Sequence, residues 1–459
     1  MARGLDRREA GADVRPLAES LSRTLLLMRD EFGFEIDDSV LLRALTSTRV
    51  ALIADSANIA SHAAQTAFVT AAMLMARSGH QVFLMAPDVT MLAPQPPLQP
   101  GTMMDRLARV GKDMLPGVQF IAGEPEGEVD LAIGLGDTPL NIHSRRRIRL
   151  NADAWAGIIM HEDQLCPWHA DLWPFGALVA AGLGAGEAFK IAMHKLLPQA
   201  VGPENTAARF TNADEVRFEL APPDTLFCRD LGEIDFVSGG AITNAVVYCL
   251  ARVPAVTAQG RIIEPDTADL TNLNRYALLL RSCRGMLKAH DLVKMLGGGL
   301  RFQPLCQRYE SALLDRIAPL APTVVVGVDH IPTRWVVQQA MPEWLVIGAT
   351  THWSAMASFH SEGLGCARCL HNEDDPGDGP MPTMACVSFW AGLLTTGYLA
   401  RHAVGQPIPA NEQQVYLTPF RPESAFRSAV AVRQGCSNCQ PPSGVVSRGP
   451  EVRQPSPIT

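Results

Sequence analysis

The sequence has no surplus of basic residues. Lys and Arg total 39 against 47 Asp and Glu, which gives a net charge of -8 and a pI near 5.9. A surface that binds nucleic acid broadly is basic, because it has to neutralise phosphates. We therefore expect no nucleic-acid partner.

The sequence also lacks a signal-like N-terminus and a long uninterrupted apolar run. Residues 1–11 hold several charges and no apolar core, which argues against a secretory signal. The best candidate for a membrane span, residues 173–200, is interrupted by Glu187 and Lys190 and is rich in Gly and Ala. A buried helix accounts for this stretch better than a transmembrane helix. We expect a cytoplasmic protein with no membrane contact.

Apolar residues and cysteines are, by contrast, well represented. Hydrophobic residues make up 47% of the 459 positions, which is enough for a large core and excludes general disorder. The length suits two or three domains. Ten cysteines in a cytosolic chain indicate metal binding or catalysis before disulfides.

Strand and helix patterns alternate in two successive series after a helical arm at residues 1–46. The first series predicts strands at 49–55, 81–87, 129–136 and 157–161 and helices at 58–78 and 175–197. The second predicts strands at 234–237, 261–264, 323–328 and 344–348 and helices at 241–253 and 387–403. Such alternation is typical of open, mostly parallel sheets. The sequence therefore predicts an α/β fold made of two tandem Rossmann-like domains.

The domain limits follow from composition. The polar stretch 200–224 contains three prolines and separates a first domain at 47–210 from a second at 225–440. The tail 441–459 carries five prolines and little apolar content. We expect this tail to be disordered.

Four cysteines form two C-x-x-C pairs, Cys366-Ala-Arg-Cys369 and Cys436-Ser-Asn-Cys439, with 66 residues between them. One pair alone is also typical of redox motifs, but two pairs supply the four thiolates of a tetrahedral Zn²⁺ site, at about 2.3 Å each. Such a closed site is structural, and it would staple the end of the chain onto its domain. His371 lies nearby as a surplus ligand. The alternative is four unrelated thiols.

A candidate phosphate-binding turn follows the predicted strand that ends at Val237. Backbone N–H groups at the start of the next helix suit a phosphate. A full G-x-G-x-x-G fingerprint needs glycine at three places, of which only Gly240 is kept, beside Gly239. Ser238 and Thr243 occupy the other two places. The turn alone is therefore a weak signal.

The residues after the next strand are more specific. That strand ends in Glu264-Pro-Asp266, where a dehydrogenase would hold the ribose, and Asn272-Leu-Asn-Arg275-Tyr276 follows. The combination resembles the adenylation signature of the ubiquitin-activating superfamily, the ThiF/MoeB-like adenylyltransferases. That signature has D-x-D at a strand end, then N-L-x-R-Q. The departures are Glu264 for Asp and Tyr276 for Gln.

Two more residues extend the resemblance, which covers residues 225–440. Lys288 stands thirteen residues after Arg275, as a Lys does in the family, and Asp329 ends a later predicted strand. The family also carries paired zinc knuckles at similar spacing. Each charged residue has a plainer alternative, since Arg275 and Lys288 would serve as surface charges and Asp329 as a helix cap.

The resemblance implies ATP-dependent adenylation of a carboxylate, with Mg²⁺. Arg275 would grip phosphate oxygens through its fork of donors, Lys288 would supply a point charge, and Asp329 would bind Mg²⁺. Asp266 would accept from the ribose hydroxyls, and Asn272 would hold phosphate or the turn. The implied nucleotide-binding residues are Gly239, Gly240, Asp266, Asn272, Arg275 and Lys288.

Cys386 is the candidate nucleophile. It follows the acidic loop 371–380 and opens the predicted helix 387–403, whose dipole would stabilise a thiolate. Shorter members of the superfamily carry a transthiolation cysteine in this region, so Cys386 would hold the modifier as a thioester. The alternative is a small buried residue. Cys306 and Cys283 are weaker candidates.

The first half lacks the motifs of the second. Ala54-Asp-Ser-Ala-Asn-Ile-Ala-Ser stands where a glycine turn would be, and no N-L-x-R, matching Lys or cysteine knuckle follows. By resemblance it is an inactive adenylation domain paired with the active one, and its partner arginine would be Arg15 or Arg23. An unrelated α/β domain is the alternative.

The favoured function is activation of a ubiquitin-like protein by C-terminal adenylation, thioester formation on Cys386 and transfer to a conjugating enzyme. The chain resembles activating enzymes of bacterial ubiquitination-like antiviral systems of the Bil type. We expect a monomer with an internal pseudo-dimer, or a homodimer. Two alternatives are adenylation of a sulfur carrier or ribosomal peptide without an enzyme thioester, and a pseudoenzyme that binds a ubiquitin-like protein.

Overall fold

A computed structural model describes residues 15–33, 35–118, 120–169, 173–200, 203–310, 317–371 and 381–439. The arm's first 14 residues, most of the acidic loop and the tail 441–459 lie outside the described residues, so the prediction of a disordered tail is not addressed.

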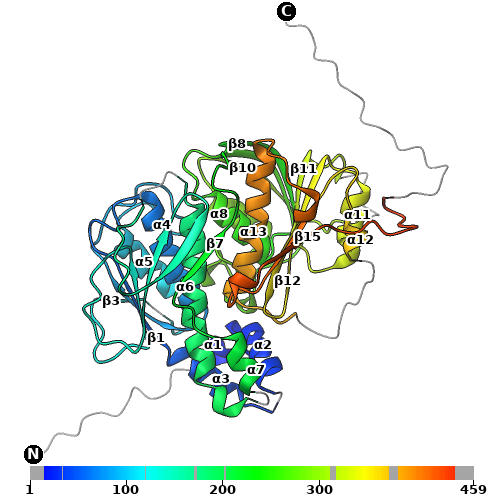
Figure 1. Ribbon diagram of the computed structural model, residues 1–459. Helices are drawn as coiled ribbons and strands as arrows, with labels where there is room; N and C mark the ends of the chain where they lie inside the picture. The colour runs from blue at the N-terminus through cyan, green and yellow to red at the C-terminus, as the bar shows by residue number, and fades with distance from the viewer. Residues whose placement is uncertain are drawn as a thin grey trace, which may run out of the picture.

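The first half is built on a seven-stranded sheet in the order β3-β2-β1-β4-β5-β6-β7 (Figure 1). β1 pairs in parallel with β2 and β4, whereas β6 runs antiparallel to both of its neighbours. The strands are β1 Arg49–Ile53, β2 Gln81–Met85, β3 Phe120–Ala122, β4 Leu131–Leu135, β5 Arg147–Ala152, β6 Ala156–His161 and β7 Val216–Glu219.

The second half repeats this plan in eight strands, in the order β10-β9-β8-β11-β12-β13-β14-β15. β8 pairs in parallel with β9 and β11, and the strands from β13 onward are antiparallel. The strands are β8 Asp230–Val237, β9 Thr257–Ile263, β10 Gly299–Leu305, β11 Thr323–Val326, β12 Trp344–Thr351, β13 Ser354–His360, β14 Gln414–Leu417 and β15 Phe426–Ser428.

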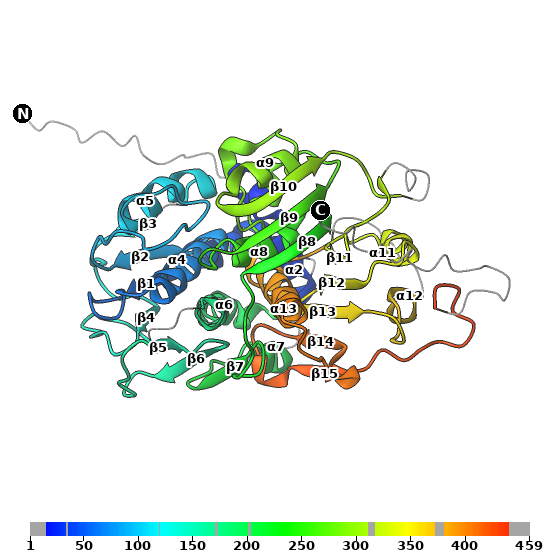
Figure 2. The same ribbon diagram turned by 90° about the horizontal axis from the view of Figure 1, so that it is seen from above.

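Four buried helices lie between the two sheets and join the halves (Figures 1 and 2). α6 packs on α4 and α13, and α13 packs on α8. These helices are apolar on nearly every side, because each contacts a sheet on one face and another helix on the other. They are α4 His62–Arg77, α6 Phe175–His194, α8 Ala241–Leu250 and α13 Ala385–Ala403.

α6 is the one helix of the described residues that is long and apolar enough to cross a membrane, and 94% of that apolar window is buried inside the molecule. The two charges that interrupt it are buried as an ion pair between Glu187 and Lys190. Arg146 donates to Glu187 at 2.9 Å and adds a second partner. The prediction of a buried helix is therefore confirmed.

The arm folds into α1 Arg15–Ser20, α2 Ser22–Phe32 and α3 Asp38–Thr46, which lie with α7 Pro203–Arg209 at one end of the molecule (Figure 1). α2 also contacts the second half, because Thr24 Oγ1 accepts from Asn274 and Glu31 accepts from Trp353. Within the described ranges, the other helices are α5 Met103–Met114, α9 Lys288–Met295, α11 Ile331–Gln339, α12 Ala367–Leu370, η1 Leu197–Gln199, η2 Leu270–Asn272, η3 Arg281–Cys283, η5 Ala410–Glu412 and η6 Pro422–Ser424.

The predicted fold class is confirmed, since two tandem open sheets share the strand order 3-2-1-4-5. Some strands were not predicted, namely β3, β5, β7, β10, β13, β14 and β15. β7 pairs with β6 in the first sheet, so that sheet extends past the predicted limit at residue 210. Several of these strands lie at or near a sheet edge and are only three or four residues long, which leaves little hydrophobic periodicity to detect.

Candidate functional site

A cavity of about 340 Å³ opens at the carboxyl ends of β8, β9 and β11. The strand order reverses at this point of the sheet, which is where open α/β folds bind ligands. Residues predicted as nucleotide or catalytic groups line it, together with Ser238, Glu264 and Tyr276: Gly240, Asp266, Asn272, Arg275, Lys288 and Asp329.

The turn after β8 keeps the shape of a glycine turn without all its glycines. Ser238 has φ 117°, a conformation that favours glycine, and its hydroxyl accepts from Gly240 N at 2.8 Å. Gly239 N donates to Glu264 Oε2 at 2.7 Å. A Cβ at Gly239 would lie 3.0 Å from the Glu264 side chain. Local hydrogen bonds thus hold the turn at the start of α8, although Gly239 itself is not among the lining residues.

The two carboxylates at the end of β9, Glu264 and Asp266, have different partners. Glu264 is buried and also accepts from Asp266 N at 3.0 Å, so it organises the turn. Asp266 is exposed and pairs with Lys288 Nζ at 3.1 Å. Burial opposes charge on Lys288, but Tyr276, Glu264 and Asp266 outweigh it and raise its pKa. Lys288 is therefore a cation held beside the cavity.

Arg275 lines the cavity with its guanidinium largely buried. Its Nη1 donates to the Thr271 carbonyl and, at 3.1 Å, to Asn274 Oδ1. Burial lowers the pKa of Arg275, and Arg23 lowers it further, whereas Tyr276 raises it. The side chain is thus a cation with no carboxylate bonded to it among the described residues.

Arg23 reaches the same cavity from α2 of the arm. Its Nη1 donates to the Met381 carbonyl at 3.3 Å. Burial lowers the pKa of Arg23, while Asp329 and Tyr276 raise it. Of the two arginines that the sequence suggested, Arg23 lines the cavity and Arg15 does not.

Asn272 holds the turn geometry. It is the last residue of η2, and its Oδ1 accepts from Asp269 N at 3.0 Å while Asp269 accepts from Thr271 N. This reciprocal capping fixes the segment that leads into Arg275. Asn272 is buried but still lines the cavity, and Asp329 does so from the loop after β11.

The four predicted metal ligands come together at one place. All four sulfurs lie within 4.8 Å of one another, and three Sγ–Sγ pairs lie 3.3 to 3.7 Å apart. Tetrahedral Zn–S bonds of about 2.3 Å place sulfurs about 3.8 Å apart, so the donors fit a zinc ion. Arg433 N also donates to one sulfur at 3.3 Å. The cluster consists of Cys366, Cys369, Cys436 and Cys439.

His371 is not part of this cluster but connects it to the cavity wall. Its Nε2 lies 2.9 Å from Arg334 Nη1, and its carbonyl accepts from Trp335. Arg334 donates to the Val328 carbonyl at 3.0 and 2.8 Å, directly before Asp329. Burial and the Arg334 charge lower the pKa of His371 to about 3, so the ring is neutral.

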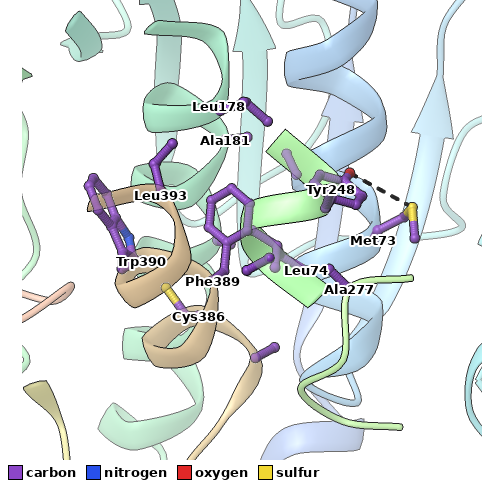
Figure 3. Close-up of a cluster of buried hydrophobic side chains, with 14 of the residues drawn as sticks. Met73, Leu74, Leu178, Ala181, Tyr248, Ala277, Cys386, Phe389, Trp390 and Leu393 are labelled. Atoms are coloured by element: carbon purple, nitrogen blue, oxygen red, sulfur yellow. Dashed lines mark hydrogen bonds between the residues drawn. The ribbon is translucent and has the colours of Figure 1, made fainter. Parts of the chain in front are cut away.

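Cys386 is buried between the halves and does not line the cavity (Figure 3). Its thiol lies 3.6 Å from the Gly182 carbonyl of α6, beside Phe389 and Trp390. Burial raises the pKa of Cys386 to about 12, which overrides the expected effect of the helix dipole. Ser388, two residues on, faces the cavity, because positions two apart lie on nearly opposite sides of a helix. In this arrangement the thiol is neither exposed nor ionised.

The matching edge of the first sheet is filled by its own side chains. Asn58 Nδ2 donates to Asp55 at 3.0 Å and to Asp137 at 2.7 Å, and Asn58 Oδ1 accepts from Trp168 N. A Cβ at Gly136 would lie 2.1 Å from Asn58 Oδ1. Asp137 follows β4 as Asp329 follows β11. The first edge has the same topology as the second but is closed by this network.

The structure thus gathers the predicted nucleotide residues at one cavity and leaves the two kinds of cysteine elsewhere. The cysteine cluster lies behind the cavity wall, and Cys386 faces the core. Arg308, Tyr309 and Arg334 also line the cavity. These residues lie outside the adenylation signature, so no local sequence pattern marked them as cavity residues.

Comparison with known proteins gives a family match in the first half. Residues 49–204 match the model described as the BilD N-terminal domain. This segment is separate from residues 225–440, which carry the adenylation signature. The match agrees with the expected resemblance to a Bil-type system, while the pairing of an inactive with an active adenylation domain stays a prediction.

Similar proteins include one curated sequence and several solved structures. An uncharacterized protein, y4jF of Sinorhizobium fredii, is 24% identical over 233 residues, 48% of this chain and 43% of its own length. The chain thus spans under half of that relative. Escherichia coli MccB with ATP is 14% identical with a TM-score of 0.40, covering 64% of this chain and 98% of MccB. MccB with AMPCPP and MccA is 13% identical over the same shares, with a TM-score of 0.41.

Proposed function

We propose that this chain activates a ubiquitin-like protein by adenylating its C-terminal carboxylate with ATP. The observation that carries the proposal is the single cavity that brings Arg23, Arg275 and Lys288 together with Asp266 and Asp329. These three cations suit a triphosphate, and the carboxylates of Asp266 and Asp329 suit a ribose and a divalent ion.

The reaction requires positive charge where negative charge shifts. A carboxylate oxygen of the substrate attacks the α-phosphorus, the bond to the bridging oxygen of the β-phosphate breaks, and pyrophosphate leaves with both electrons. Arg275 and Arg23 would hold phosphate oxygens, and Lys288 would bind a third as a point charge. Asp329 would hold Mg²⁺, which neutralises the phosphates when it is bound.

The four-cysteine cluster supports a structural zinc ion. Thiolates of Cys366, Cys369, Cys436 and Cys439 would fill all four positions of a tetrahedral ion and leave none open. Without an ion the four thiols do not ionise together. Burial opposes ionisation of Cys436, but the amides of Cys439 and Asn438 lower its pKa to about 6, whereas burial raises the pKa of Cys366 to about 11. The ion would tie the chain after β15 to α12.

The BilD match supports a Bil-type antiviral system as the setting. A separate ubiquitin-like protein would be the substrate and a conjugating enzyme the acceptor, both in the cytoplasm. The contacts of α13 with α6 and α4, and the hydrogen bond between Thr70 of α4 and Tyr248 of α8, support a monomer with an internal pseudo-dimer, with a homodimer as the second possibility.

A second candidate is adenylation without an enzyme thioester on Cys386. The burial of that thiol and its raised pKa favour this candidate, since a thiolate is the nucleophile in transthiolation. A thioester on Cys386 would require α13 to release the side chain from α6. A sulfur carrier or a peptide would then be the substrate class. The cations that line the cavity argue against the third alternative, a pseudoenzyme.

The proposal is tested by modifier-dependent exchange of labelled pyrophosphate into ATP. We expect exchange in the wild type and a loss of roughly 100-fold in Arg275→Ala, because a donor to the transition-state charge is removed. Arg281→Ala, on the same segment but outside the cavity, is the matched control and should keep exchange. Exchange that survives Arg275→Ala would refute the phosphate assignment, and its absence in the wild type would favour the pseudoenzyme.

A further inference from the structure

Arg77 is the last residue of α4 in the first half, yet its side-chain hydrogen bonds are made to the second half. It is 1% exposed. Its guanidinium donates to the carbonyls of Leu273 at 2.5 Å, Leu279 at 2.7 Å and Ala277 at 3.2 Å. These carbonyls stand on both sides of Arg275 in the chain. Arg77 therefore bonds the backbone of the segment that carries the cavity arginine.

The electrostatics of Arg77 are unusual for a core residue. No carboxylate pairs with it among the described residues, and burial lowers its pKa to about 10. A buried cation is costly unless it is hydrogen-bonded, so carbonyl groups must provide the compensation. Those carbonyls belong to residues 273–279, a stretch of turns with few ladder bonds of its own. The segment and the arginine thus stabilise each other.

The chain offers a matched counterpart on the other side of the interface. Arg252 follows α8 as Arg77 ends α4, and it is equally buried, with a pKa lowered by burial to about 10. Its Nη2 donates to the Pro96 carbonyl of the first half at 2.9 Å, and its Nη1 to Tyr248 O at 2.9 Å. The two arginines cross the interface in opposite directions. Of these two arginines, only Arg77 is hydrogen-bonded to a segment that lines the cavity at the carboxyl ends of β8, β9 and β11.

We propose that Arg77 is a positioning residue for the adenylation site. It holds the backbone on both sides of Arg275 and Tyr276 so that their side chains face the cavity. Through it, the first half is needed for nucleotide binding although its own sheet edge is closed. This inference rests on the proposed function.

The test compares Arg77→Met with Arg252→Met in the full chain, measuring the KM for ATP and kcat in pyrophosphate exchange and the melting temperature. Both variants should lose a similar amount of thermal stability. We expect Arg77→Met to raise the KM for ATP roughly tenfold or more, with partial recovery in Arg77→Lys, and Arg252→Met to stay within about twofold. Equal effects of the two variants on KM would overturn the proposal.

A second readout works without activity. Amide hydrogen exchange should speed up at residues 273–279 in Arg77→Met and at residues 93–100 in Arg252→Met. Unchanged exchange at 273–279 would overturn the inference even where the enzyme is active. Failure of the proposed function would appear differently, as a wild type without pyrophosphate exchange but with this pattern of amide protection intact. If Arg77→Met does not fold, Arg77→Lys against Arg252→Lys decides by the same criteria.

Discussion

After β1 in the first sheet, Asn58 turns inward and bonds Asp55, Asp137 and the Trp168 amide, which closes the carboxyl edge. After β8 in the second sheet, the Ser238 hydroxyl accepts from Gly240 N and Gly239 N donates to Glu264. These bonds stay within the turn and the neighbouring strand end, so the edge stays open. Both edges lie at the same reversal of strand order. The difference shows that topology offers a binding edge, while a few loop side chains decide whether it is available.

The comparison extends to charge. Among the cations that line the open edge, Arg23, Arg275 and Lys288 come from three separate elements, α2, the segment after η2 and α9. The closed edge has Arg149, but its guanidinium is engaged by the carbonyls of Gly136, Thr138 and Glu162. An arginine saturated by carbonyls holds a loop, whereas one with free donors can hold phosphate.

The largest expected difference between the two edges concerns their equivalent aspartates, Asp329 and Asp137. Asp329→Asn removes a charge from the open edge and should raise the Mg²⁺ concentration for half-maximal pyrophosphate exchange by roughly tenfold or more. Asp137→Asn, the same change at the closed edge, should leave it within about twofold. A Mg²⁺ titration of exchange measures both. Similar shifts in the two variants would mean that the edges are not functionally distinct.

Removal of the proposed zinc ion should have an intermediate effect. The path from the cysteine cluster through His371 and Arg334 to the Val328 carbonyl leads to the open edge. Chelation should therefore raise the Mg²⁺ requirement a few-fold, together with release of about one zinc ion per chain and faster amide exchange at residues 366–371.

His371→Ala tests the same path without touching a cysteine. It should retain zinc and reproduce part of the shift, because the link to Arg334 is lost. If chelation leaves the Mg²⁺ dependence of exchange unchanged, the cysteine cluster does not influence the cavity and only holds the end of the chain in place.

The smallest effect is expected at Cys386, which lies between the halves. Cys386→Ala should leave pyrophosphate exchange within about twofold, since the thiol does not line the cavity. In the folded wild type, a thiol reagent at pH 8 should label Cys386 only on unfolding, because the group is buried and its pKa is raised to about 12. Peptide mass mapping identifies the labelled residue.

A thiol-sensitive adduct with the modifier that disappears in Cys386→Ala would contradict this expectation. It would show that α13 releases the side chain during the reaction. The thioester prediction would then stand, with a conformational step added to it.

Several features of the protein followed from the sequence alone. Alternating strand and helix patterns predicted two tandem α/β units, because periodicity is a local property. The C-x-x-C pairs predicted the four-sulfur cluster, since metal ligands have fixed chemistry and short spacing. The acidic strand end and the Asn272–Arg275 segment predicted residues that line one cavity. In each case neighbours in sequence carried the signal.

The tertiary structure decided what depends on packing between distant segments. It put Arg23 of the arm in the cavity, filled the first edge with Asn58, buried Cys386 against α6, and set Arg77 on the carbonyls beside Arg275. Exposure, pKa and orientation are properties of the assembled core. A helix N-terminus alone would lower the pKa of Cys386, but burial against α6 raises that pKa.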